Sequence, residues 1–136
     1  MTVWNNEIPF SDAWLAEAKS CPEAEKIGMY LLHNGVVRAT AKAEVREGQR
    51  CDSVAGLEFS YDREKVLAAL SETESLPGIY YIRLWLNSGR LSVGDDLMYV
   101  LVGGDIRPRV IDTLQHLVER LKSECVTERE LTYSGT

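Results

Sequence analysis

Three cations border apolar segments of the chain and are the residues best suited to chemistry: Arg38, Arg107 and Lys122. Arg38 follows an apolar stretch, Arg107 begins an amphipathic segment, and Lys122 ends it. Gathered in one pocket, such cations would bind anionic substrates, and a lysine amine beside apolar neighbours suits acid–base or transient covalent work. The alternative is structural, because a lysine in the last turn of a helix also complements the helix dipole. Arg107 gains nothing from the dipole at a helix start, so it is the stronger sign of a functional cluster.

Other catalytic sites have little support in the residue pattern. His33 and His116 are the only histidines, and neither has a second ligand three or four residues away on the same face, so we expect no metal site. The chain has no G-x-S-x-G motif, no P-loop and no G-x-G-x-x-G motif, and we expect no cofactor. Glycines at 103–104 open toward a predicted helix, where the backbone amides of residues 105–108 could hold an anion.

Composition excludes several classes of protein. The chain has 136 residues, of which 45% are hydrophobic and 26% charged, and this predicts one globular domain over residues 1–136. A net charge of -6 opposes nucleic-acid binding. No run approaches the roughly eighteen apolar residues of a membrane span, and the first residues lack a secretory signal, so we expect a cytoplasmic protein without membrane contact. Cys21, Cys51 and Cys125 are widely spaced and odd in number, which predicts free thiols.

Hydrophobic periodicity predicts the elements that must position these residues. Ser11 and Asp62 are candidate N-caps of two helices, and Pro108 suits the first turn of a third. We predict helices at 11–19, 62–75 and 107–122, a buried strand at 27–37, further strands at 54–61, 79–86 and 97–102, a loop or hairpin at 38–53, and a strand-like tail. This order is typical of an α+β domain with a mostly antiparallel sheet and a long helix packed on it.

The third helix has the clearest apolar face. The residues that recur on that face are Val110, Ile111, Leu114, Leu117, Val118 and Leu121. At about 100° per residue, Lys122 lies beside Ile111 and Val118 at the edge of the face, so it need not point into open water. Arg107 lies about 22 Å away along a helix that rises about 1.5 Å per residue. The two residues therefore cannot share a small pocket within one chain, and a common site would require a symmetric dimer.

Three segments resemble one known family. "GMYLLHNGVVR" matches a first-strand pattern G-x-x-V-x-F-x-G-x-V-R through Gly28, Gly35 and Arg38. "SGRLSVGDDLMYVLVGGDIR" is similar to a pattern I-G-x-L-x-x-G-D that precedes an apolar strand and a His-Arg pair, in which the arginine falls on Arg107. The interval from Arg107 to Lys122 matches that from this arginine to a catalytic lysine. Over residues 26–131 the chain resembles the large, catalytic subunit of molybdopterin synthase, the MoaE family.

The chain also departs from the family pattern. Ile106 stands where the family has the histidine, and "SECVTERE" replaces a P-[IFL]-W-K-[KR]-E segment that carries a second active-site lysine. Ungapped spacing puts this lysine on Arg129, and alignment of the RE ending puts it on Glu128. Arg129 keeps the charge but cannot serve as an amine nucleophile or base. A short R-N-x-N-x-G loop is replaced by the longer "RATAKAEVREGQR".

The resemblance implies an α/β-hammerhead fold, a homodimer and a defined reaction. A small ubiquitin-like subunit ending in Gly-Gly would bring a thiocarboxylate, and its sulfur would pass to cyclic pyranopterin monophosphate (precursor Z) in molybdenum cofactor biosynthesis. Lys122 would be the catalytic amine, and Arg38, Arg107 and Arg129 would bind substrate. One alternative is a non-catalytic paralogue that binds the small partner or a pterin ligand, and another is a dimeric domain without a ligand.

Overall fold

The computed structural model describes residues 2–39 and 54–132 and confirms the α+β class. The predicted loop or hairpin at 38–53 lies almost wholly outside the described residues, as does Cys51. The elements are β1 (Thr2–Val3), α1 (Ser11–Ala18), the 3-10 turn η1 (Ala24–Lys26), β2 (Met29–Val36), β3 (Val54–Tyr61), α3 (Arg63–Glu74), β4 (Ile79–Leu86), β5 (Gly89–Ser92), β6 (Asp96–Gly104), α4 (Arg107–Arg120), the π-helical turn η2 (Leu121–Cys125) and β7 (Val126–Thr132).

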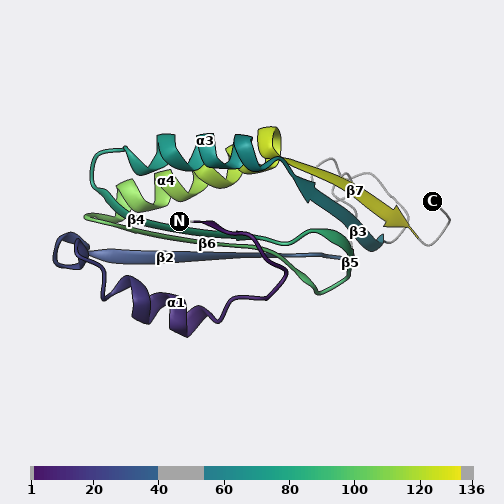
Figure 1. Ribbon diagram of the computed structural model, residues 1–136, viewed down its shortest axis with the longest axis horizontal. Helices are drawn as coiled ribbons and strands as arrows, with labels where there is room; N and C mark the ends of the chain where they lie inside the picture. The colour runs from purple at the N-terminus through teal and green to yellow at the C-terminus, as the bar shows by residue number, and fades with distance from the viewer. Residues whose placement is uncertain (1, 40–53, 133–136) are drawn as a thin grey trace.

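The larger of two sheets has the strand order β1-β4-β6-β2. β6 pairs antiparallel with both β4 and β2, and among the described strands only the two-residue β1 runs parallel to its neighbour. Helices α3 and α4 lie on one face of this sheet and α1 lies on the other (Figure 1). The segment 27–37 was predicted to be a buried strand, but its residues in β2 are mostly half-buried because β2 is an edge strand.

The smaller sheet has the order β5-β3-β7, and both pairings are antiparallel. It lies beyond the end of α4, where the chain passes through η2 into β7 (Figure 1). The sequence predicted a strand at β3 and a strand-like tail at β7 but no strand at β5, and it did not divide the strands between two sheets. The division matters for function because the end of α4 meets both sheets at once.

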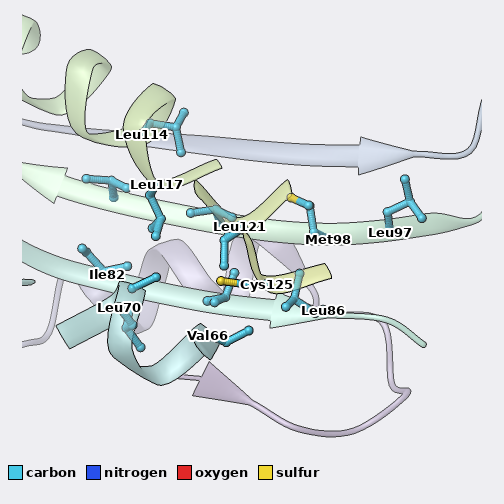
Figure 2. Close-up of a cluster of buried hydrophobic side chains, with 14 of the residues drawn as sticks. Val66, Leu70, Ile82, Leu86, Leu97, Met98, Leu114, Leu117, Leu121 and Cys125 are labelled. Atoms are coloured by element: carbon cyan, nitrogen blue, oxygen red, sulfur yellow. The ribbon is translucent and has the colours of Figure 1, made fainter. Parts of the chain in front are cut away.

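The main core fills the space between the large sheet and the helices α3 and α4. Leu114, Leu117 and Leu121 point into it from α4 and η2, and Cys125 joins them from the end of η2 (Figure 2). Ile111 was predicted on the same face but is 37% exposed. Its position at the edge of the helical stripe explains this, because neighbours at the next turns occupy the contact with the sheet.

The residues predicted to begin the three helices are confirmed in two cases and wrong in one. The Asp62 carboxylate accepts a 3.2 Å hydrogen bond from the N–H of Lys65 and caps α3 as predicted. Pro108 lies in the first turn of α4, also as predicted. The prediction for Ser11 is wrong, since α1 begins at Ser11 itself and Phe10 occupies the capping position without a side-chain hydrogen bond. Among the described residues no helix is long and apolar enough to cross a membrane.

Candidate functional site

Lys122 lies where α4 passes into the π-helical turn η2. Its neighbours Leu121 and Cys125 are buried in the main core and fix the turn against the sheet. Lys122 itself is half-buried. From this turn the side chain of Lys122 lines two depressions.

The first depression, which we call the large hollow, has a volume of about 780 Å³. Its apolar side chains come from α4, and a histidine from β2 faces them across the hollow. Its lining comprises His33, Leu114, Gln115, Val118, Glu119, Lys122 and Ser123. A lysine and a glutamate are thus the charged groups of a partly apolar hollow large enough for a small organic ligand.

The second depression, the small pocket, has a volume of about 50 Å³ and is lined by Val36, Val37, Arg38, Val54, Leu57, Leu97, Lys122, Glu128 and Glu130. Arg38 and Lys122, which the sequence analysis selected for their positions at element ends, therefore meet in one pocket. Two carboxylates from β7 share it. Because Lys122 lines both depressions, we treat the two together as one candidate site.

His33 is the residue of this site that the sequence analysis missed as a functional candidate. It pairs with Val100 across β2 and β6, on the face of β2 that carries Met29 and Leu31 toward the main core. Its Nε2 atom is buried and has no hydrogen-bond partner among the described residues. Burial, and secondarily the positive charge of Lys122, lowers the pKa of His33 below its ordinary value of 6.5. The imidazole is therefore neutral at physiological pH.

Arg107 lies at the opposite end of α4, exposed, and follows an equally exposed Ile106. The structure thus separates Arg107 from Lys122 within one chain, as helix geometry requires. The prediction that amides 105–108 could hold an anion is wrong. The N–H of Asp105 bonds to the carbonyl of Gly78 at 2.9 Å, that of Ile106 bonds to the Asp105 carboxylate at 2.7 Å, and Pro108 has no N–H.

Arg129 lies on the exposed side of β7, outside the lining of both the large hollow and the small pocket. It forms a 2.8 Å ion pair with Glu58 of β3, the residue opposite it in the strand register. Hydrogen bonds from Arg129, and to a lesser degree from Arg90, lower the pKa of Glu58. Side chains alternate along a strand, so Glu128 and Glu130 face the small pocket and Arg129 faces away from it.

The family model described as MoaE protein matches residues 7–124. The chain belongs to the MoaE family. No curated protein matches the chain by sequence.

Solved MoaE-type structures share the fold. A MoaE protein from Burkholderia ambifaria MC40-6 matches with a TM-score of 0.70 and 20% identity, over 96% of this chain and 82% of that one. Molybdopterin synthase from Staphylococcus aureus matches with a TM-score of 0.66 and 18% identity, over 82% and 79%. A chain from the complex of subunits 1 and 2 of the Helicobacter pylori 26695 molybdopterin-converting factor matches with a TM-score of 0.65 and 16% identity, over 90% and 76%. These neighbours confirm the predicted molybdopterin-synthase-like fold.

Within this MoaE chain, one signal in the sequence could have revealed His33. The first-strand pattern G-x-x-V-x-F-x-G-x-V-R has phenylalanine at this position, and the chain has histidine. The replacement puts a titratable group in β2, five residues before Arg38. It also occurs in a chain that has lost the histidine before Arg107, where Ile106 now stands.

Proposed function

We propose that this chain is the large subunit of a molybdopterin synthase and acts in molybdenum cofactor biosynthesis. The thiocarboxylate of a small ubiquitin-like subunit ending in Gly-Gly would supply the sulfur, and cyclic pyranopterin monophosphate would receive it. Lys122 would be the catalytic amine, with Arg38, Arg107 and Arg129 as substrate-binding residues. The observation that carries the proposal is the meeting of Lys122 and Arg38 in one pocket of a MoaE-family fold.

The charges that line the small pocket are balanced, so the proposed anionic substrate needs a further cation. In the small pocket two cations, Arg38 and Lys122, face two carboxylates, Glu128 and Glu130. An anionic group would bind beside this pocket only if further positive charge were present. The exposed Arg107 of the partner subunit would provide it, which makes a homodimer part of the proposal.

A second candidate function is a non-catalytic paralogue that binds the small partner or a pterin ligand. The observation in its favour is the carboxylate of Glu128 at the small pocket, in a segment where the family pattern has a lysine. A carboxylate there would repel both anionic reactants, the thiocarboxylate and the pterin phosphate. The two candidates share the fold and the partner, so only the reaction distinguishes them.

The test is conversion of precursor Z by the chain together with a thiocarboxylated small subunit. We expect the wild-type protein to form the dithiolene product and Lys122→Ala to lose at least about 100-fold in rate, as expected for a group that takes part in proton transfer or covalent catalysis. Lys19→Ala is the matched control, because Lys19 is an exposed lysine after α1 on the other face of the sheet. Partner binding by both proteins without conversion by either would establish the paralogue.

A further inference from the structure

The large hollow brings a neutral imidazole and a lysine amine to one place. His33 comes from β2 and Lys122 from η2, and these two elements meet only because α4 packs across the face of β2. Glu119 is the other titratable group in the lining. Lys122 has its role in the proposed function, but nothing so far gives His33 one.

The surroundings of His33 keep it in the form that accepts protons. An imidazolium must donate from both ring nitrogens, yet Nε2 is buried and has no acceptor among the described residues. A Cβ atom added at Gly35 would lie only 3.6 Å from Nε2, so this nitrogen is turned toward its own strand. Because His33 lines the hollow, we infer that its other ring nitrogen, Nδ1, is the one that meets it. Burial and the charge of Lys122 add to the preference for the neutral ring by lowering the pKa of His33.

The proposed sulfur transfer contains a step that needs a base. A thiocarboxylate gives up its sulfur only when the bond between that sulfur and the carbonyl carbon breaks. Once the sulfur is bonded to the pterin, the carrier is held as a thioester, and water is the nucleophile available to release it. Water attacks poorly unless a base takes its proton as the new bond forms.

We propose that His33 is the general base that activates this water in the large hollow. The inference rests on the proposed function, since it names a residue for one step of that reaction. The water oxygen bonds to the carbonyl carbon while its proton moves to Nδ1 of His33. The carbon–sulfur bond then breaks, its electron pair leaves with the sulfur as a thiolate on the pterin, and the carrier leaves as a carboxylic acid. The ammonium of Lys122 stabilises the negative charge on oxygen during the attack and on sulfur afterwards.

The first test is a single-turnover reaction with thiocarboxylated carrier and precursor Z, followed by mass spectrometry. His33→Phe is the informative variant, because the MoaE pattern has phenylalanine there and the fold should tolerate it. We expect carrier release to slow by about 100-fold, the lower range for loss of a general base, and the carrier–pterin thioester to accumulate. His116→Phe, which alters an exposed histidine on α4, should release the carrier at the wild-type rate.

The pH dependence separates a base from a packing residue. The wild-type rate of release should fall as the pH drops through the lowered pKa of His33, because the protonated ring accepts no proton. His33→Phe should lack this decrease. A variant with the wild-type rate, or with the same decrease in acid, would overturn the role of His33 and leave the proposed function intact. A wild-type protein that transfers no sulfur would overturn both together.

A second measurement needs no turnover. The two histidines give two imidazole signals in a ¹H–¹³C NMR titration, and His33→Phe identifies which belongs to His33. In Lys122→Met the pKa of His33 should rise, because the neighbouring positive charge is gone. The signal of His116, an exposed residue of α4, is the internal control. If the titration midpoint of His33 is the same in Lys122→Met as in the wild type, Lys122 does not lie close enough to His33 to act with it, and the inference is overturned.

Discussion

At the scale of single residues, the site depends on which charged side chains share a pocket. Lys122 and Arg38 could be predicted from the sequence because each stands at the end of an apolar element and each fits a family pattern. His33 could not be found in the same way, since an isolated histidine in a strand has no spacing partner. Its place in the site depends on the register of β2 and on the packing of α4 across that strand, and both are features of the tertiary structure.

The two arginines Arg38 and Arg129 give a prediction at this scale. Arg38 lines the small pocket with Lys122, whereas Arg129 is held by Glu58 on the exposed side of β7. We therefore expect Arg38→Ala to reduce precursor Z conversion more strongly than Arg129→Ala does. Steady-state kinetics should show the difference chiefly in KM, because a binding cation contributes to ground-state affinity. The reverse order of the two variants would mean that the substrate lies over β3 and β7 instead.

At the scale of elements, α4 and η2 position Lys122, the proposed catalytic lysine. The periodic apolar face of α4 predicted the helix, but nothing in the sequence predicted that its last turn would widen into a π-helical turn. The turn is tied to α3, because the N–H of Asp62 bonds to the carbonyl of Cys125 at 2.9 Å. The orientation of β7 also escaped prediction. Ungapped alignment favoured Arg129, whereas the strand register turns Glu128 toward the pocket.

The caps of α1 and α3 provide a prediction about elements. Asp62→Ala removes the carboxylate that caps α3 and should lower the free energy of unfolding by about 1 kcal/mol. Ser11→Ala should have an effect of no more than a few tenths of a kcal/mol, because Ser11 makes no capping bond. Urea unfolding followed by circular dichroism measures both changes. Equal losses in the two variants would show that capping does not distinguish these helices.

At the scale of the whole molecule, the site lies where the two sheets and the end of α4 meet. The α+β class, the long helix and the family could be predicted from patterns within single segments. The division into two sheets could not, since strands of either sheet show the same alternation of apolar and polar residues. In the proposed function, the position of Arg107 at the far end of α4 leaves the site of a single chain incomplete. A second copy with the opposite orientation would complete it, and light scattering should then give twice the chain mass of 15.3 kDa.

The most direct test of the central claim is the activity of a dimer that carries Lys122→Ala in one chain and Arg107→Ala in the other. Two different affinity tags allow this mixed dimer to be purified away from the two uniform variants. If each site takes Lys122 from one chain and Arg107 from its partner, one of its two sites is intact, and it should show about half of the wild-type rate of precursor Z conversion. The uniform variants should both be nearly inactive. A mixed dimer no more active than those variants would contradict the account.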